Sequence, residues 1–259
     1  MKQKLSIIKI GGNIIEDQEF LSQFLKLFAQ MEGNKILVHG GGKRATEFGK
    51  RLGIESKMVD GRRITDAKSL ELVVMVYAGL VNKNIVAELQ ANNSNAIGLS
   101  GADANTVIAV KRPVNKIDFG FVGDIIAVNS DSISKLLSAE FAPVFCALTH
   151  DRHGQLFNTN ADTIASEVAI AMSRDYDTTL YYCFEKKGVL RSIKDEDSVI
   201  QKIDRQIYEE LKQKKIVADG MLPKLENCFH ALNKNVQRVC IGDISMFEHE
   251  AKLFTTITL

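Results

Sequence analysis

The sequence VHGGGK, residues 38–43, joins a short apolar run to a basic segment through three consecutive glycines. A glycine run before a lysine suggests a phosphate-binding loop such as the P-loop, G-x-x-x-x-G-K-[ST]. However, Leu37 stands where the first P-loop glycine should be, and Arg44 replaces the Ser or Thr. The stretch is therefore not a P-loop. It predicts a buried strand, a glycine turn and a helix whose free N–H groups attract an anion, or else only a tight strand-to-helix connection.

The same succession of short apolar runs and longer amphipathic stretches continues along the chain. Residues 20–31 repeat apolar side chains at helical spacing, and residues 70–89 form a long apolar stripe. Strands are expected in the apolar runs 5–10, 35–39, 96–99, 143–147, 179–182 and 238–241. This alternation predicts the α/β class, as a three-layer αβα sandwich with a mainly parallel, open central sheet.

Two stretches interrupt this alternation. Residues 57–65 are expected to form a small hairpin with Asp60-Gly61 at its turn, and residues 106–129 are expected to form further β-hairpin structure. Both contain turn-forming glycines between strand-like segments, which is why we expect strands there rather than helices.

A soft boundary between two halves is expected at residues 173–177. The helix that begins near Ala161 ends there in polar residues. We place a substrate-binding half in residues 1–174 and a second half in residues 175–259, with one continuous sheet running through both.

Composition and charge exclude several classes of function. The formal net charge of +1 gives no electrostatic reason to expect nucleic acid or an anionic membrane as a partner. No run approaches ~20 apolar residues, and Lys9, Gly11 and Gly12 interrupt the N-terminal apolar run, so neither a membrane span nor a signal peptide is expected. The four cysteines are scattered, which indicates buried thiols in a cytoplasmic protein rather than a zinc site.

The turns after the first two strands are the first candidates for a binding site. In parallel sheets ligands bind beyond the carboxyl ends of the strands, where the turns after Ile10 and His39 must lie. Lys9 ends the first strand, and the N–H groups of Gly11 and Gly12 can point at one phosphate, although a plain turn with an exposed lysine also fits. His39 is either a general base or a hydrogen-bonded structural histidine.

Polar side chains elsewhere could bind a substrate. Arg62 and Arg63 offer planar forks for a carboxylate, but strand alternation should let only one of them enter a given pocket. Asn158 and Asn160 supply neutral donors and acceptors, or else form only a turn and a helix N-cap. Asp162 lies in the first turn of the following helix, where the helix dipole favours a carboxylate.

Lys224 completes the candidate constellation. It follows Pro223 at a helix start, an unfavourable place for a cation unless an anion binds there, although a surface lysine also fits. Together these stretches supply two lysines, two glycine turns, an arginine and an aspartate. Phosphoryl transfer requires such parts, because it depends on positioning and charge neutralisation. A Rossmann dehydrogenase is disfavoured, since G-x-G-x-x-G does not follow the first strand.

These motifs resemble the amino-acid kinase family along nearly the whole chain. They occur in the order and spacing of the family: IIKIGGN, LVHGGGK, GRRIT, AIGLSGAD, DFGFVGDI, NTNADTIAS and DGMLPKLENC. The resemblance implies the amino-acid kinase fold and transfer of the ATP γ-phosphoryl group to the side-chain carboxylate of N-acetyl-L-glutamate, the second step of arginine biosynthesis. It further implies Mg²⁺ bridging the ATP phosphates with few direct protein ligands.

The resemblance also assigns roles to individual residues. Lys9 and Lys224 would stabilise the transferring phosphoryl group from opposite sides, and Asp162 would organise both lysines. Gly12 and Gly41 would present N–H groups to the reacting atoms, with Gly42 beside them. Lys43 would be incidental.

Substrate and nucleotide contacts follow from the same resemblance. Arg63 would hold a substrate carboxylate, and Asn158 with Asn160 would hold the acylated amino-acid backbone. The nucleotide would lie in the second half, against Glu185, Lys187, Gly188, Leu190, Ile216 and Ala218. This segment departs from the family pattern S-D-V-x-G, so a catalytically silent ligand sensor is an alternative, which retention of both lysines and the aspartate argues against.

Arg62 is a second departure, because relatives carry an apolar residue in the acyl-methyl pocket. A cation beside a methyl group would lose hydration without compensation. Phosphorylation of N-succinyl-L-glutamate is therefore an alternative to the acetyl substrate, unless Arg62 turns to solvent. Because the first strand begins by about Lys4, leaving no room for the N-terminal helix of arginine-inhibited relatives, the resemblance implies a homodimer without arginine feedback.

Overall fold

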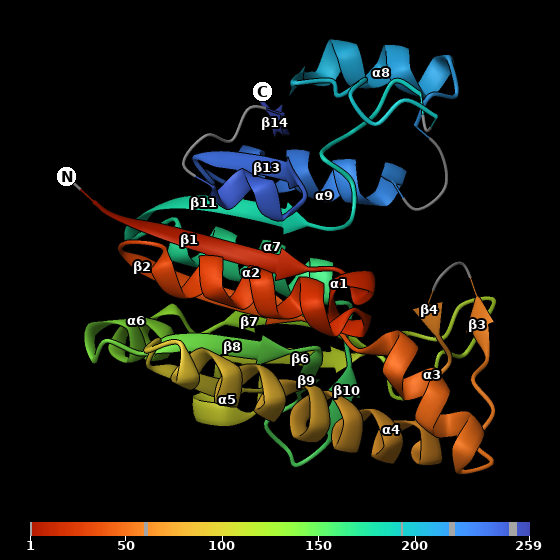
Figure 1. Cartoon of the computed structure of the whole chain (residues 1–259). Coiled ribbons are helices and arrows are strands. Elements are labelled where there is room, and N and C mark those ends of the chain that lie inside the picture. The colour runs from red at the N-terminus through yellow and green to blue at the C-terminus, as the bar shows by residue number, and fades with distance from the viewer. Residues whose placement is uncertain (1, 60–61, 193, 218–220, 249–252) are drawn as a thin grey trace.

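A computed structural model of the chain describes residues 2–59, 62–192, 194–217, 221–248 and 253–259. The chain forms a three-layer αβα sandwich around one eight-stranded, mainly parallel sheet (Figure 1). In spatial order its strands are β12 (Lys202–Ile203), β14 (Thr255–Ile257), β13 (Arg238–Gly242), β11 (Tyr176–Cys183), β1 (Gln3–Ile10), β2 (Asn34–His39), β8 (Ala142–Cys146) and β5 (Ala96–Leu99). Strand β14 pairs antiparallel with β13, and the other pairings of this sheet are parallel. The predicted fold class is confirmed.

The central strands are buried on both faces, as their continuous apolar runs predict. Strand β1 pairs with β11 on one side and with β2 on the other, so the sheet is continuous across the two halves of the sequence. The register aligns Ile10 with both His39 and Cys183. The strand ends that follow these residues therefore lie side by side at one edge of the sheet.

Helices cover both faces of the sheet. One side carries α2 and α5 in mutual contact, and the other carries α7 against α6 and α9 (Figure 1). The helices are α1 (Gly12–Glu16), α2 (Gln18–Gln30), α3 (Gly42–Arg51), α4 (Ala67–Val73), α5 (Asn82–Ala91), α6 (Ser130–Ser138), α7 (Ala161–Met172), α8 (Arg205–Gln213) and α9 (Met221–Asn233), with 3₁₀ turns η2 (Asp103–Asn105) and η3 (Ile244–Phe247). Side-chain caps fix several starts: Asp17 accepts from the Phe20 N–H at 3.0 Å to begin α2.

Helices α4 and α5 are joined without a break by a π-helix, η1 (Val74–Val81). The combined helix Ala67–Ala91 is long and apolar enough, by length and composition alone, to cross a membrane. The helix is not an uninterrupted apolar run, because Lys68, Glu71, Lys83 and Glu88 lie within it, so it does not overturn the expectation that no run of ~20 apolar residues is present. Core helices of soluble proteins share this length and composition, and 39% of the most apolar 18-residue segment of the helix is buried inside this fold.

Two smaller β structures flank the sandwich. The four-stranded sheet has the order β10 (Leu156–Asn158), β9 (Leu148–His150), β6 (Val107–Lys111) and β7 (Gly123–Val128), and a short ribbon pairs β3 (Met58–Val59) with β4 (Arg62–Arg63). Both predicted hairpins are thus present, although the Asp60-Gly61 turn lies outside the described residues. All four cysteines are buried and unpaired, as predicted.

Candidate active site

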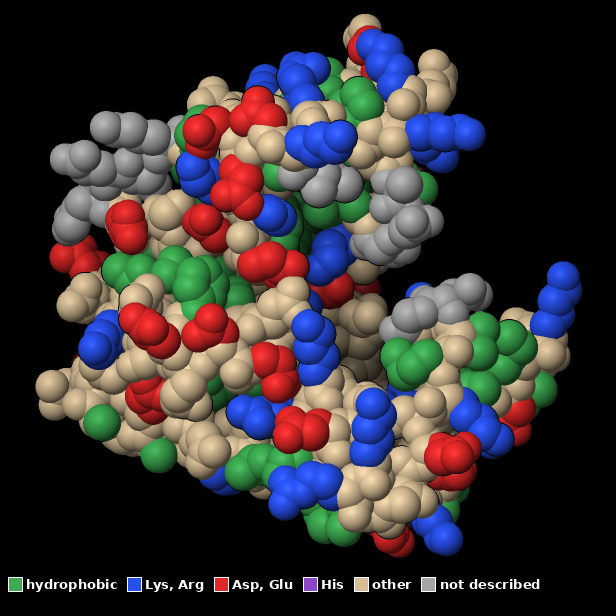
Figure 2. Space-filling view, turned by 45° about the vertical axis from the view of Figure 1, so that its right-hand side comes forward, with side chains coloured by type: hydrophobic (Ala, Val, Ile, Leu, Met, Phe, Trp, Pro, Cys, Tyr) green, Lys and Arg blue, Asp and Glu red, His purple; other side chains and the backbone are tan. Residues whose placement is uncertain are grey.

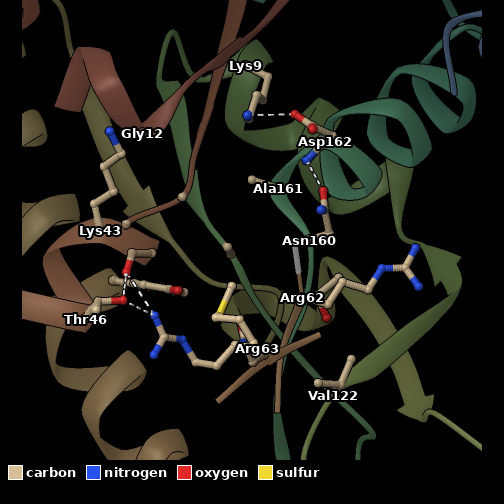
Figure 3. A pocket seen from close by; sticks show the side chains of 18 of the residues that line it. Lys9, Gly12, Lys43, Thr46, Arg62, Arg63, Val122, Asn160, Ala161 and Asp162 are labelled. Carbon is tan, nitrogen blue, oxygen red and sulfur yellow. Dashed lines mark hydrogen bonds and ion pairs between the residues drawn. The ribbon is translucent and has the colours of Figure 1, made fainter. Parts of the chain in front are cut away.

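A cleft opens at the edge of the large sheet where β1 and β2 end. Figure 2 shows the surface hollowed on its right-hand side, between the C-terminal half above and the part that carries α3, β3 and β4 below. The cavity measures about 640 Å³. Its walls come from the turn after β1 (residues 11–13, the β1 turn), the turn after β2 (residues 40–42, the β2 turn), α3, β4, η1 and the start of α7 (Figure 3).

Two lysines meet the carboxylate of Asp162, and of these three residues Lys9 and Asp162 line the cavity. The Lys9 Nζ lies 2.7 Å from Asp162 Oδ1, and the Lys224 Nζ lies 3.5 Å from Asp162 Oδ2 (Figure 3 shows the first pair). Burial alone would raise the pKa of Asp162, but the two lysines outweigh burial and hold that pKa below its ordinary value. Two cations sharing one carboxylate leave an excess positive charge, so the cluster attracts an anion.

Three separate elements deliver these side chains. Lys9 comes from the end of β1, and Asp162 comes from the first turn of α7, which Asn160 caps by accepting from the Asp162 N–H at 2.7 Å. The Tyr182 hydroxyl also donates to the Asp162 carbonyl at 3.2 Å. Lys224 lies in the first turn of α9, where Asp162 compensates for the unfavourable helix dipole.

The β2 turn is held by buried groups. His39 is fully buried, and burial lowers its pKa to about 4, so its ring is neutral near pH 7. A buried, neutral, hydrogen-bonded ring fits the structural interpretation of His39 better than a general base. Gly41 lies against the ring of Tyr77, and a Cβ at Gly41 would come within 2.7 Å of the Tyr77 Cδ1. No larger residue fits there without moving the ring.

Arg62 and Arg63 both line the cavity, which corrects the expectation that only one of them could. Alternation along β4 does separate them by burial, since Arg63 is buried and Arg62 is exposed. The Arg63 Nη2 donates to the Gly42 carbonyl at 2.9 Å and to the Thr46 hydroxyl at 2.8 Å, while its Nη1 donates to the Ser56 hydroxyl. Arginine has five N–H donors, so Arg63 retains capacity for a ligand carboxylate.

Asn158 and Asn160 also line the cavity. The Asn158 Nδ2 donates to the Thr65 hydroxyl at 3.0 Å, which orients the side chain from the strand β10. Asn160 serves as the N-cap of α7, so the plain N-cap interpretation holds for this residue alongside its place in the cavity wall.

The expected nucleotide segment does not line this cavity, apart from Gly12. The Glu185 Oε1 accepts from the Asn13 Nδ2 at 2.6 Å, and the Lys187 Nζ pairs with Asp197 at 2.6 Å. Gly188 is packed tightly against Val199 and Thr255, and Leu190 bridges to Val199. Ile216 packs against the hydrophobic core, and Ala218 lies outside the described residues.

Several cavity residues were not identified from the sequence. Lys43, set aside as incidental, lines the cleft and donates to the Asn13 Oδ1. Thr46 follows Gly42 by one helical turn, a spacing that could have indicated it. Tyr77 and Arg112 could not have been found this way, because Tyr77 belongs to an apolar helix and Arg112 lies outside the DFGFVGDI motif of its hairpin.

Comparison with known proteins identifies relatives of the whole chain. Residues 4–243 match the model of the amino acid kinase family. A protein of Cytophaga hutchinsonii named acetylglutamate kinase is 58% identical over 92% of this chain and 91% of its own. Proteins of the same name are 54% identical in Bacteroides fragilis, over 93% of this chain and 92% of theirs, and 36% identical in Methanopyrus kandleri, over 93% and 95%.

Solved structures share the architecture. The Streptococcus mutans protein smu.665 superposes with a TM-score of 0.78 at 27% identity, and covers 98% of both chains. The N-acetylglutamate synthase of Neisseria gonorrhoeae, solved with coenzyme A and N-acetyl-glutamate, gives a TM-score of 0.82 at 18% identity over 99% of this chain and 59% of its own. At that identity the second likeness concerns the fold alone.

Proposed function

The chain belongs to the amino acid kinase family, and on that premise we propose that it is an acetylglutamate kinase. It transfers the γ-phosphoryl group of ATP to the side-chain carboxylate of N-acetyl-L-glutamate, giving an acyl phosphate in the second step of arginine biosynthesis. Relatives of that name span more than nine tenths of the chain at up to 58% identity. The observation that carries the proposal is the Lys9–Asp162–Lys224 cluster, in which one carboxylate of the cleft pairs with two lysines.

The cluster suits phosphoryl transfer because the transferring group carries spread negative charge. Lys9 and Lys224 approach Asp162 from different elements, so they reach an anion beside it from two sides. Asp162 holds both ammonium groups in place. A carboxylate nucleophile is already ionised at pH 7, so the reaction needs no general base. The neutral His39 therefore has no proton to remove from the substrate.

The residues present fit ATP with Mg²⁺, which would supply the phosphoryl group and neutralise part of its charge. Lys9 and the N–H groups of Gly12 and Gly41 form a donor set for phosphate oxygens, and Lys224 lies beside them through its pair with Asp162. Within the part of the chain that the structure describes, no group of three or more His, Cys, Asp or Glu side chains could hold a metal ion. Magnesium would therefore be held mainly by the nucleotide phosphates.

The acyl amino acid would bind deeper in the cleft. Arg63 would take its α-carboxylate, while Gly42, Asn158 and Asn160 would contact its amide backbone, all on the walls of one cavity. The nucleotide would lie over the C-terminal half, residues 175–259, near Glu185, Lys187, Gly188, Leu190, Ile216 and Ala218. The hydrogen bond between Asn13 and Glu185 supports this placement, because it ties that segment to the β1 turn.

A cytoplasmic homodimer is part of the proposal, with its interface in residues 1–174. The long helix Ala67–Ala91 buries one side in the core but exposes Met75 and Leu80 on η1. Covering these two side chains would remove apolar surface from water, which favours association. A second copy of the chain would cover them.

Neither the succinylated substrate nor the catalytically silent sensor is favoured. Arg62 is exposed at the rim of the cavity, and the relatives are named for the acetylated substrate rather than a succinylated one. The silent-sensor alternative is weakened because Lys9, Asp162 and Lys224 are assembled around one point. A sensor would have no need of both lysines.

The decisive experiment measures ADP release, with the acyl phosphate trapped as a hydroxamate, for N-acetyl-L-glutamate, N-succinyl-L-glutamate and free glutamate. The wild type should prefer the acetyl compound, and Arg62→Leu should leave the ratio of kcat/KM for the two acyl compounds unchanged. A preference for the succinyl compound that Arg62→Leu abolishes would establish the charged-acyl alternative. ADP release with none of the compounds, despite binding, would establish the sensor.

A further inference from the structure

A buried side-chain pair lies directly beneath the β2 turn. The His39 Nε2 lies 3.0 Å from the Asn82 Nδ2, and the His39 Nδ1 lies 2.8 Å from the Gly40 carbonyl oxygen. Both side chains are essentially inaccessible to solvent, at 0% and 1% exposure. Neither residue lines the cavity, but His39 is one peptide away from Gly40, which does.

The hydrogen bonds determine which histidine nitrogen carries the proton. The Asn82 Nδ2 also lies 2.9 Å from the Val144 carbonyl, which can only accept, so this atom of Asn82 is the NH₂ group. The Lys83 ammonium, 3.3 Å from Asn82 Oδ1, agrees with that orientation. Asn82 therefore donates to Nε2 of His39, and the neutral ring donates its Nδ1–H to the Gly40 carbonyl.

This donation fixes the peptide between Gly40 and Gly41. In a trans peptide the C=O and N–H groups point in opposite directions, and all peptides described here are trans. Because the Gly40 carbonyl is directed at the buried His39 ring, the Gly41 N–H is directed away from it, toward the side on which Gly41 lines the cleft. A glycine turn would otherwise rotate easily, since glycine has wide conformational freedom.

The π-helix explains how one helix reaches the turn at two places. Tyr77 packs its ring against Gly41, and Asn82, five residues later, bonds to His39. In an α-helix such residues would point about 140° apart. The Asn82 N–H bonds to the Tyr77 carbonyl, an i→i+5 contact that adds a residue to the turn and brings the two side chains toward one side.

A glycine in the neighbouring strand makes room for this arrangement. Gly98 of β5 lies so close to Asn82 that a Cβ there would collide with the Asn82 Oδ1. The AIGLSGAD stretch therefore contributes to the site without lining the cavity: its Gly98 leaves room for the Asn82 amide, which donates to the Val144 carbonyl of β8.

We propose that His39 and Asn82 are positioning residues that hold the Gly40–Gly41 peptide so that the Gly41 N–H faces the transferring phosphoryl group. The inference rests on the proposed kinase function, and neither residue touches substrate. Misdirecting one N–H donor at a reacting oxyanion lowers kcat by about 10²-fold, with little change in KM when the donor acts mainly in the transition state.

A matched pair of variants tests the inference. In His39→Asn the side-chain NH₂ is attached to Cγ, as Nδ1 is, and can keep the bond to the Gly40 carbonyl. In His39→Gln the amide reaches the Nε2 position and loses that bond. Each variant loses one buried hydrogen bond, so their thermal stabilities should fall alike. We expect kcat of His39→Gln to be about tenfold or more below that of His39→Asn, with KM values within about threefold.

The controls are His150→Asn and His150→Gln, at a second buried histidine that does not line the cavity. These two should have equal kcat values. Equal kcat values for the two His39 variants, or a difference that follows their thermal stability, would overturn the inference.

A second measurement does not depend on activity. In ¹⁵N spectra of histidine-labelled wild-type protein at pH 7, His39 should be the neutral, Nδ1-protonated tautomer. The Nε2-protonated tautomer would overturn the inference whatever the kinetics. If the wild type phosphorylates no acyl glutamate, the proposed function fails separately. The Gly41 amide resonance then decides, because it must shift more in His39→Gln than in His39→Asn.

Discussion

The two glycine turns of the cleft lie side by side but are built on different physical principles. The β1 turn follows Lys9, whose buried ammonium is paired with Asp162, and it ends at the exposed Asn13. The β2 turn follows His39, which is equally buried but neutral, and it is covered by the ring of Tyr77. Charge organises one turn, and packing with neutral hydrogen bonds organises the other.

This difference separates two tasks that phosphoryl transfer combines. Charge near the β1 turn attracts the anion and neutralises it, whereas fixed neutral groups under the β2 turn direct N–H donors at it. Charges in a largely buried site act strongly over several ångströms, but hydrogen-bond donors work only within a narrow range of distance and angle. The two turns should therefore respond differently to substitution.

The largest effect is expected from breaking the charged turn. Asp162→Asn keeps the shape of the side chain but removes the charge that holds Lys9 and Lys224, so kcat should fall by about 10²- to 10³-fold. The measurement is steady-state ADP release with saturating substrates. Asp131→Asn, in an exposed pair with Arg174, serves as the control and should have wild-type kcat. A kcat within about threefold of wild type for Asp162→Asn would contradict the idea that charge organises the β1 turn.

A steric substitution should affect the two turns unequally. Gly41→Ala places a Cβ within 2.7 Å of the Tyr77 ring, whereas the nearest atom to a Cβ at Gly12 is the Lys43 side chain at 4.0 Å. The neutral turn must then shift, and kcat/KM should fall by about 100-fold in Gly41→Ala but only severalfold in Gly12→Ala. Equal losses of kcat/KM in both variants would contradict tight packing of the β2 turn against Tyr77.

Acid should weaken the neutral turn through His39. Its pKa is about 4 in the folded protein, against about 6.5 in an unfolded chain, so only the unfolded state gains this proton as pH falls from 6.5 to 4. Stability is therefore lost in that window, by at most about 3 kcal/mol. Urea unfolding at pH 7.5 and 4.5 measures the loss, and His39→Asn should show less of it. An identical pH dependence in the variant would place the acid sensitivity elsewhere.

The smallest effect should come from the exposed end of the β1 turn. Asn13→Ala removes the hydrogen bonds to Lys43 and Glu185, which water can replace at this exposed position. The KM for ATP should rise by no more than about threefold, with kcat unchanged. The assays vary ATP at fixed acyl glutamate. A larger rise in the KM for ATP would mean that water cannot replace the hydrogen bond between Asn13 and Glu185.

Much of the fold could be predicted because its signals are local. The apolar runs that became β1, β2, β5, β8, β11 and β13 all belong to the large sheet, and the central strands β1, β2 and β8 are buried on both faces, as expected in a parallel sheet covered by helices. The glycines after Ile10 and His39 marked the edge at which a site must lie. Lys9, Asp162 and Lys224 were identified by motif order, although they meet only through the fold.

Other features could not be predicted. A long apolar stripe at residues 70–89 indicates a helix, but it does not reveal the i→i+5 turns of η1 or that Tyr77 and Asn82 face the β2 turn. Alternation separated Arg62 from Arg63 by burial, but the curvature of the cleft brings both to its wall. Lys43 was set aside because the resemblance assigns the catalytic roles to Lys9 and Lys224, and its partner Asn13 is thirty residues away in the sequence.

The sequence by itself thus determined which segments form the main strands, where the glycine turns lie and which ionisable residues belong to the cleft, because each of these depends on residue type and local spacing. Only the tertiary structure decided which nitrogen of His39 carries the proton, which way the Gly40–Gly41 peptide faces and how Lys9 and Lys224 share one carboxylate. The physical reason is that hydrogen bonds and ion pairs act over a few ångströms between groups far apart in the chain, and only the packed fold sets those distances.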